Sequence, residues 1–268
     1  MCVTSGPAKL GKTIISISEK VVGQQQRLVH VLGYQNSPTN LSPGPNAMLI
    51  HFPTKSHMTP ANVLDTKGCK KLLTDMVAAQ YPPQEGVTRG GLSHLFSKAY
   101  VFESGIYTIV LAPKAELVYE ALSRVPADKR PNISKELLQF YAQNYPGWPI
   151  ALCCFNSKQS EEADPLMWWY EPMDTSTFML PGIDCHTGGV PDYRSQITRT
   201  PMLIFGSDHF PSGVGHKVNY TDNIPDQTRL FLPKKVFVVS FREKTRNGDY
   251  ILPRADVYQG NEYALTIR

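Results

Sequence analysis

The stretch Thr13-Ile14-Ile15-Ser16-Ile17-Ser18-Glu19-Lys20-Val21-Val22 is rich in β-branched residues and alternates apolar with polar side chains. A two-residue period of this kind is typical of a β-strand. Gly23-Gln24-Gln25-Gln26 then provides a turn, and Arg27-Leu28-Val29-His30-Val31-Leu32 is suited to pair back on the first strand. The chain is therefore predicted to begin with antiparallel strands.

Further strands are expected along the chain, each in a short apolar run that a turn ends. They fall at residues 47–52, at 100–102 and 107–111 around Gly105, and at 150–155, 166–170, 202–205 and 236–241. The turn Arg246-Asn247-Gly248-Asp249 carries an Asn-Gly hairpin signal before the apolar residues 250–252. No helical period is found from Ile150 onward, so the C-terminal part of the chain is predicted to be strand-rich.

Helical patterns are confined to the middle of the chain. An apolar stripe over residues 72–77 predicts one helix, with Thr66 as a candidate N-cap. Pro113 suits the first position of a second helix, whose apolar face lies within residues 117–125. A third helix is expected over residues 134–144.

These patterns together predict the fold class. Strands before and after a helical middle are typical of an α+β protein rather than of alternating βαβ units. The sheets are expected to be predominantly antiparallel, with two or three helices in residues 60–145, and a layered αββα arrangement is compatible with this. No linker divides the chain, so residues 1–268 are predicted to form a single domain.

The composition is that of an ordinary globular protein, with 41% hydrophobic and 19% charged residues. The net charge is +4, and the densest basic cluster, Lys234-Lys235, is only a pair. A nucleic-acid surface needs a concentrated basic stripe, and a membrane-spanning helix needs about 18 or more apolar residues in a row. Neither nucleic acid nor a membrane is therefore expected as a partner.

The cysteines indicate the compartment. There are five, an odd number, and Cys153-Cys154 is a vicinal pair that is poorly suited to ordinary disulfides. The N-terminus also lacks the long apolar run of a secretory signal. Free thiols in a reducing cytosol fit these features best, so a cytoplasmic protein is predicted.

Gly6-Pro7-Ala8-Lys9-Leu10-Gly11-Lys12-Thr13 satisfies the phosphate-loop pattern G-x-x-x-x-G-K-[ST]. In a true phosphate loop this pattern opens a helix, whose backbone amides cradle the phosphates. Here the residues that follow, Ile14 to Ser18, have a strand pattern. The match is therefore interpreted as a surface turn with a solvated lysine.

Cys2 follows the initiator methionine directly, in Met1-Cys2-Val3-Thr4-Ser5. Removal of Met1 would leave Cys2 with both a thiol and a free α-amine. The amine titrates near pH 8 and can act as a base for its own nucleophile. Cys2 is thus a candidate catalytic residue for amide hydrolysis.

A Met-Cys start resembles the N-terminal-nucleophile hydrolases, which include class II glutamine amidotransferases and choloylglycine-type hydrolases. The resemblance implies antiparallel sheets between helices. Choloylglycine-type enzymes carry Gly-Arg-Asn and a nearby Asp after the second strand, where this chain has Leu32-Gly33-Tyr34-Gln35-Asn36, without the arginine and aspartate. The resemblance implies that Asn36 contacts the oxyanion or the substrate. It also implies a small-molecule or peptide substrate and no cofactor.

Acidic and histidine residues gather in two later loops. The first, Leu180 to Asp192, holds Asp184 and His186, and the second holds Asp208 and His209. Loops between strands commonly carry function, so these four residues are candidate binding residues.

Several roles remain open for these loops. Asp184, His186 and His209 could bind a metal, and Cys185 could pair with His209 as a nucleophile and base. No C-x₂-C or H-x₃-H spacing occurs here, so no structural zinc is predicted. The alternative is a tight turn in which Asp184 caps local amides.

The leading hypothesis is a cytosolic amide-bond hydrolase with Cys2 as nucleophile and Asn36 as a contact. The alternative is a non-catalytic α+β protein that acts through assembly, including homo-oligomerisation, or through partner binding. It is supported by the lack of a complete catalytic constellation and by the aromatic strand Met167-Trp168-Trp169-Tyr170, whose two tryptophans face opposite sides.

Overall fold

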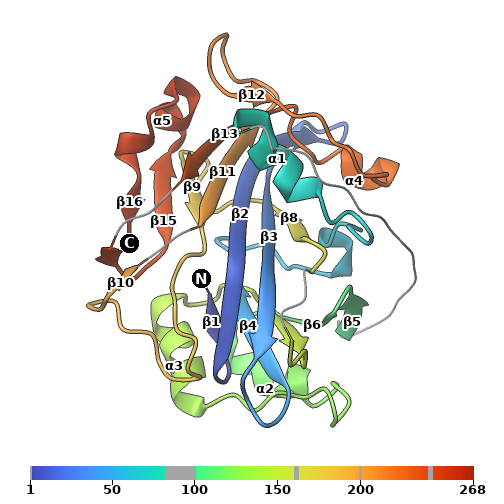
Figure 1. Cartoon of the computed structure of the whole chain (residues 1–268), viewed down its shortest axis with the longest axis vertical. Helices are drawn as coiled ribbons and strands as arrows, with labels where there is room; N and C mark the ends of the chain where they lie inside the picture. The colour runs from blue at the N-terminus through green and yellow to red at the C-terminus, as the bar shows by residue number, and fades with distance from the viewer. Residues whose placement is uncertain (1, 82–100, 160–162, 199–200, 241–243) are drawn as a thin grey trace.

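The computed structural model describes residues 2–81, 101–159, 163–198, 201–240 and 244–268, and Figure 1 shows the arrangement. Two sheets of five and six strands dominate, with two small sheets beside them. All strand pairs within these sheets are antiparallel except β2 with β11. The predicted α+β class with predominantly antiparallel sheets is confirmed.

The six-stranded sheet is built around the predicted N-terminal hairpin, drawn in blue across the middle of Figure 1. The first hairpin strand is longer than predicted, because its pairing with the second continues past a bulge between Gly11 and Ile14. The sheet has the order β12-β13-β11-β2-β3-β8. Its strands are β12 (His216–Lys217), β13 (Lys235–Ser240), β11 (Met202–Ser207), β2 (Ala8–Val22), β3 (Arg27–Asn40) and β8 (Leu166–Tyr170).

The five-stranded sheet has the order β1-β4-β7-β6-β5. Its strands are β1 (Val3–Thr4), β4 (Asn46–His51), β7 (Ile150–Phe155), β6 (Tyr107–Ala112) and β5 (Val101–Ser104). Alternating residues of the central strands, such as Leu49 and Met48, face opposite sides, so this sheet contributes to two separate cores.

The layers follow from these two cores and a third. The core between the two large sheets includes Ile15 and Ile17 from one sheet and Ile50 from the other. Helices α2 (Val118–Leu122) and α3 (Lys135–Asn144) cover the outer face of the five-stranded sheet, and α1 (Leu72–Gln80) covers the outer face of the six-stranded sheet. The order helix, sheet, sheet, helix agrees with the αββα arrangement considered from the sequence.

Gly33 permits the close approach of α1 to the sheet. A Cβ atom at this position would lie 2.3 Å from the Oγ of Ser16 and 3.1 Å from a Cδ of Leu73. The first contact is too short for any real Cβ atom and the second is tight, so a side chain here would displace Ser16 and Leu73, whereas glycine lets the helix pack closely against the sheet.

Two small sheets and several short helices complete the described residues. The small sheets are β16-β15-β9, with β9 (Thr177–Leu180), β15 (Tyr250–Pro253) and β16 (Thr266–Ile267), and β10-β14, with β10 (Gln196–Thr198) and β14 (Lys244–Arg246). The short helices are η1 (Pro60–Asn62), η2 (Ala115–Leu117), α4 (Asp226–Arg229), α5 (Arg254–Gln259) and η3 (Glu262–Ala264).

The structure corrects several sequence predictions about helices. The C-terminal part is not free of helix, because α4 and α5 lie there. Thr66 is not an N-cap, since α1 begins at Leu72 and the Thr66 hydroxyl donates to the Pro165 carbonyl oxygen. Helical structure near Pro113 begins only at Ala115.

Two predictions about turns and strands also change. The Asn247-Gly248 turn does not join a hairpin, because β14 pairs with β10 whereas β15 pairs with β9 and β16. Residues 8–13 of the phosphate-loop match lie in strand β2, so the match neither opens a helix nor forms the predicted surface turn, although Lys12 is exposed as expected. Tyr100 and Phe241, at the ends of two predicted strands, lie outside the described residues.

None of the helices in the described part of the chain is long and apolar enough to cross a membrane. A single domain over residues 1–268 stays a prediction.

Candidate functional site

The N-terminal segment and the predicted loop at 180–192 lie side by side. The Thr4 amide donates to the Cys185 carbonyl oxygen at 2.9 Å, and the Cys185 amide donates to the Cys2 carbonyl oxygen at 3.1 Å. The Ala8 amide also bonds to the His186 carbonyl oxygen at 3.0 Å. In Figure 1 the segment that follows β9 passes the chain's N-terminus on its way to the end of α3. The loop therefore closes over the start of the chain like an additional strand.

Asp184 is the polar centre of this corner. Its Oδ1 accepts the Cys2 backbone amide at 3.1 Å and lies 2.9 Å from the His186 Nε2. Its own backbone is held by the amide side chain of Asn247, with bonds of 2.9 and 2.8 Å. Burial alone would raise the pKa of Asp184, but the contact with His186, the nearby N-terminal charge and the Cys2 amide together hold the pKa below its ordinary value. The carboxylate thus stays charged while it fastens the loop to the N-terminus.

The Cys2 thiol is closed off. Its side chain is 4% exposed and packs in the core between the two large sheets, in hydrogen-bonding contact with the Tyr34 side chain. Burial raises the pKa of the thiol to about 12, and the nearby charge of Asp184 acts in the same direction. A nucleophilic cysteine requires the thiolate, which this environment disfavours.

Asn36 is also occupied internally. The Tyr107 hydroxyl donates to its Oδ1 at 2.9 Å, and its Nδ2 lies 3.1 Å from the Met48 sulfur. Lys12 and Thr13, at the bulge of β2, lie opposite Asn36 in the pairing with β3. An oxyanion contact needs a donor that points to the reacting atoms, whereas this buried amide completes hydrogen bonds within the core.

Asp208 and His209 belong to a different neighbourhood, at the far end of β11. Asp208 accepts from the Lys20 Nζ at 2.7 Å and from the Lys234 amide at 2.8 Å. Burial opposes its charge, but the hydrogen bonds and charges of Lys20 and Lys234 together hold the pKa of Asp208 below its ordinary value. His209 has an exposed side chain, and its backbone amide donates to the Ser207 Oγ at 3.0 Å. The structure thus brings Asp184 and His186 together but separates them from Asp208 and His209.

This separation rules on the two alternative roles considered for the loops, a metal site and a Cys185–His209 catalytic pair. In the part of the chain that the structure describes, no three His, Cys, Asp or Glu side chains gather as a metal site. Asp184, His186 and His209 do not form one. The Cys185 sulfur lies 3.3 Å from the Thr187 Oγ1 and 3.4 Å from the Gly189 carbonyl oxygen, within its own loop and not beside His209.

Sequence reasoning missed a buried polar cluster around Asp249. The carboxylate accepts from the Tyr145 hydroxyl at 2.7 Å and lies 3.1 Å from the His51 Nε2. Its other oxygen accepts the amides of Gly182 and Ile183 at 2.8 and 3.0 Å. Burial would raise the pKa of Asp249, but the charge and hydrogen bond of His51 and the bond from Tyr145 lower it below its ordinary value. Asp249 appeared in the sequence only as a turn residue, so no local signal marked its burial.

A second missed cluster surrounds Glu19. Its carboxylate accepts two bonds from Arg254, at 2.7 and 2.9 Å, and one from the Ser207 Oγ at 3.2 Å. The Tyr258 hydroxyl also donates to it. A signal for this cluster was present, because Glu19 lies on the same strand face as Ile15 and Ile17, which face the core.

The hydrogen bonds around these buried carboxylates are better suited to a structural role than to catalysis. Glu19 and Asp208 are each bonded to a cation and Asp249 to the His51 ring, all three accept further internal hydrogen bonds, and each fastens two segments that are distant in sequence. The Cys2 thiol is buried and protonated. A catalytic group instead needs access to substrate.

Comparison with known proteins gives the fold a precedent. No family model matches the chain, and no curated protein matches it by sequence. The crystal structure of baculovirus P35 is similar with 14% sequence identity and a TM-score of 0.50, over 94% of this chain and 99% of that one. A mutated baculovirus P35 after caspase cleavage is similar with 14% identity and a TM-score of 0.47, over 91% of this chain and 98% of that one.

These comparisons correct the leading hypothesis. The amide-hydrolase function proposed from Cys2 is wrong, because a solved structure that shares the architecture over nearly the whole chain is that of baculovirus P35, and because the Cys2 thiol is buried. The resemblance of the Met1-Cys2 start to N-terminal-nucleophile hydrolases stays a prediction from sequence. The alternative, a non-catalytic α+β protein that acts through a partner, agrees better with the fold.

Proposed function

We propose that this chain is a non-catalytic protein that acts by binding a protein partner, and that the partner is a protease of the caspase class. The observation that carries the proposal is the likeness to P35, which extends over nearly the full length of both chains. P35 is a protein that a caspase cleaves in mutated form. Shared architecture over so much of both chains makes a shared kind of partner the first one to test.

The interior supports a binding role. Asp184, Asp249 and Glu19 each hold a loop or helix against the sheets through hydrogen bonds across more than sixty positions in sequence. Such anchoring suits a rigid framework, and a rigid framework reduces the entropy cost of presenting a surface to a partner. A framework of this kind needs no catalytic group of its own.

The cytoplasm is the proposed compartment. All five cysteines are free in the structure, as expected for a protein of a reducing environment. A peptide or protein ligand is retained as the partner class, and association between copies of the wild-type chain stays a prediction.

The test measures caspase activity on a fluorogenic peptide while the folded full-length chain is titrated into a panel of caspases. Progress curves and intact-mass spectra then show whether the chain inhibits the enzyme and whether it is cleaved. We expect loss of activity for at least one caspase and a complex that co-elutes with it in size-exclusion chromatography.

The heat-unfolded chain is the control, because an unfolded chain competes only as an ordinary substrate. Papain and trypsin provide cysteine and serine proteases of other classes. Unchanged activity of every caspase, with no co-elution, would contradict the caspase proposal. Inhibition of papain or trypsin alone would move the partner to another protease class.

A further inference from the structure

Strand β13 lies next to the edge of the six-stranded sheet, and the edge strand β12 has only two residues. β12 pairs with β13 at Lys235 and Val236, so Val238 and Ser240 lie beyond its end. In an antiparallel pair, alternate residues direct both backbone polar groups to the same side. Unpaired groups along such an edge are a template for another strand.

The side chain of Gln80 occupies this edge at Val238. Its Nε2 donates to the Val238 carbonyl oxygen at 2.9 Å, and its Oε1 accepts the Val238 amide at 2.8 Å. On its inner side Val238 stands opposite Ile204 of β11. A primary amide presents a donor and an acceptor together, as a peptide group does. Gln80 therefore takes the place of one residue of a neighbouring strand.

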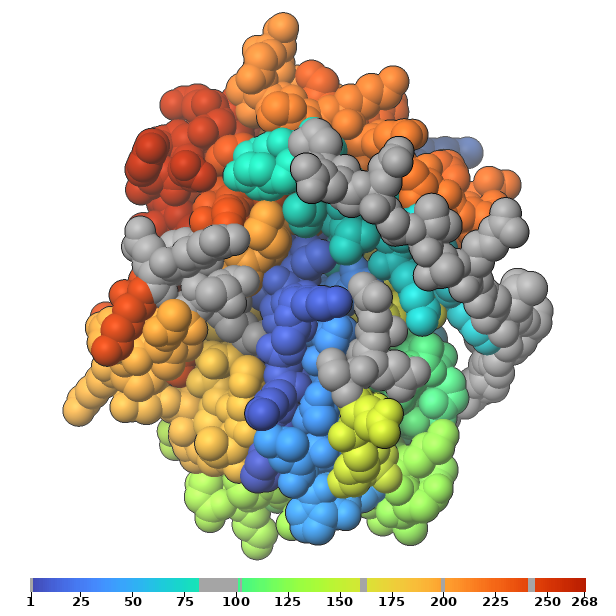
Figure 2. All heavy atoms as spheres, in the orientation of Figure 1, coloured from blue at the N-terminus to red at the C-terminus, as the bar shows by residue number. Residues whose placement is uncertain are grey.

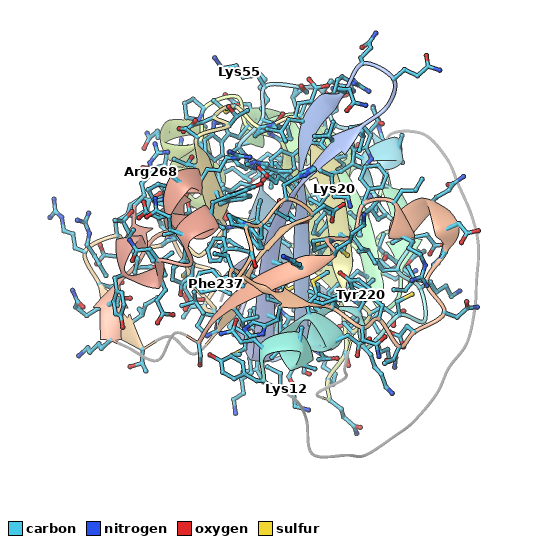
Figure 3. All side chains as sticks on the ribbon, turned by 90° about the horizontal axis from the view of Figure 1, so that it is seen from above. Lys12, Lys20, Lys55, Tyr220, Phe237 and Arg268 are labelled. Atoms are coloured by element: carbon cyan, nitrogen blue, oxygen red, sulfur yellow. The ribbon has the colours of Figure 1, made fainter. Side chains whose placement is uncertain are left out.

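Helix α1 holds Gln80 in this place. The Lys71 amide, just before the helix, donates to the Asp222 Oδ2 at 2.7 Å. Asp75 accepts from the Thr221 amide at 2.6 Å and from its hydroxyl at 2.9 Å. Figure 3, which looks onto this end of the molecule, shows α1, in teal, beside the strand that carries Phe237. These hydrogen bonds fasten α1 to residues 221–222, which follow β12. The last residue of the helix, Gln80, then covers the edge of β13.

We propose that the outer edge of β13 beyond β12 is a strand-binding edge that Gln80 keeps closed, and that its occupant when Gln80 is lost is the same edge of a second copy. The stretch Val236-Phe237-Val238-Val239-Ser240 has no charged residue and no proline. It combines β-branched and aromatic residues, the composition that favours strand pairing between chains.

The pairing of two copies can be stated in register. An antiparallel pair centred on Val239 sets Val238 of each copy opposite Ser240 of the other, and leaves β12 in place at Val236. The same patch serves both copies, as a two-fold interface requires. In the wild-type chain Gln80 and the half-buried last turn of α1 stand in the way.

The test compares the wild-type chain with Gln80→Ala and with the control Gln143→Ala, which removes an exposed glutamine near the end of α3. Amide hydrogen exchange follows Val238, and sedimentation velocity over a concentration series follows association. We expect Gln80→Ala in dilute solution to exchange the Val238 amide about ten-fold faster or more. At higher concentration it should associate, whereas Gln143→Ala should behave as the wild type.

Two further variants separate the edge from other causes. Gln80→Glu replaces the donor to the Val238 carbonyl oxygen with a carboxylate oxygen that this carbonyl repels, so the Val238 amide should exchange faster here as well. It also carries the exchange test if circular dichroism shows Gln80→Ala to be unfolded. Gln80→Ala with Ser240→Lys places a charge at the pairing edge and should return the protein to a monomer.

Two results would overturn the proposal. One is a Gln80→Ala variant that stays monomeric with unchanged exchange at Val238. The other is association that persists when Ser240→Lys is added, since this would place the contact on another surface.

Discussion

The Tyr145 hydroxyl donates a 2.7 Å hydrogen bond to the carboxylate of Asp249, a residue 104 positions further along the chain. Tyr145 follows α3 on the outer side of the five-stranded sheet, whereas Asp249 lies between β14 and β15. The bond therefore ties the helix layer to the small C-terminal sheet, and the same carboxylate holds the loop that covers the N-terminus.

Replacement of Tyr145 by phenylalanine tests this tie. Tyr145→Phe keeps the ring, whose centre lies 3.9 Å from the His51 ring centre, but removes a donor to a buried carboxylate. We expect the free energy of unfolding to fall by about 2 kcal/mol, the usual effect of losing a hydrogen bond to a charged group. Urea denaturation followed by fluorescence measures it. Tyr263→Phe, at a residue that is 92% exposed, should change almost nothing, and an equal loss in both variants would contradict the role of Asp249.

His30 makes stability depend on pH. Its ring stacks on Phe178, with ring centres 5.1 Å apart, and burial lowers its pKa from 6.5 to about 4. The charges of Glu19 and Asp174 oppose this shift, and that of Arg254 adds to it. In the folded state His30 is thus neutral above about pH 4, whereas in the unfolded state it binds a proton below about pH 6.5. Stability is therefore fully present above pH 6.5 and is lost as the pH falls towards 4.

The variant His30→Phe keeps the stacking and removes the titration. Across this window the wild type should lose about 3 kcal/mol more than the variant, from the span between the two pKa values. Denaturation curves at several pH values measure the difference. His216→Gln, at an exposed histidine of β12, should keep the wild-type slope. Parallel slopes for the wild type and His30→Phe would show that His30 does not titrate as inferred.

The five cysteines should differ strongly in reactivity. Cys185 is half-exposed in its loop, whereas Cys2, Cys69, Cys153 and Cys154 are buried. Burial raises the pKa of Cys2 and of Cys154 to about 12, so few of their thiols are ionised near neutral pH. Iodoacetamide labelling of the native protein, followed by peptide mass spectrometry, should modify Cys185 first and Cys2 only after unfolding. Fast labelling of Cys2 in the native state would require an open N-terminal corner.

Local patterns predicted much of the framework because the large sheets bury regularly alternating residues. Ile15 and Ile17 face one core and Ile14 faces another, which is the period that indicated the first strand. The short helix α5 escaped prediction, since six residues do not complete two turns of a helical period. The bulge opposite Asn36 and the hydrogen bonds between Gln80 and Val238 depend on partners that lie far away in sequence, and no local pattern contains them.

The candidate site was predicted less well for the same reason. The sequence placed Asp184 and His186 in one loop, and the structure brings the two side chains together. It also suggested an accessible thiol at Cys2, but accessibility is decided by the loop at residues 182–187, which is bonded to the N-terminal segment across 182 positions. Burial of this kind arises only when the whole chain is packed.

The pair of Glu19 and Arg254 offers the sharpest test of the buried charges. Glu19 has a 2% exposed side chain and accepts both a 2.7 Å and a 2.9 Å bond from Arg254, the first residue of α5. Arg254→Ala would leave a buried carboxylate without its cation. We expect a loss of about 2 kcal/mol in the free energy of unfolding, because the Arg254 side chain is 41% exposed but the carboxylate that loses its charged hydrogen bonds is buried.

Adding Glu19→Gln to Arg254→Ala should recover part of that loss, because the stranded charge disappears. Arg27→Ala is the matched control, since Arg27 pairs with Glu171 at 2.8 Å where both side chains are largely exposed. That variant should lose no more than about 0.5 kcal/mol, as exposed ion pairs contribute little. Urea denaturation of each variant measures the free energy of unfolding, and a double-mutant cycle with the single variant Glu19→Gln gives the coupling between Glu19 and Arg254. Equal losses in the two single arginine variants would mean that the charge of Glu19 is solvated and does not hold α5 to the sheet.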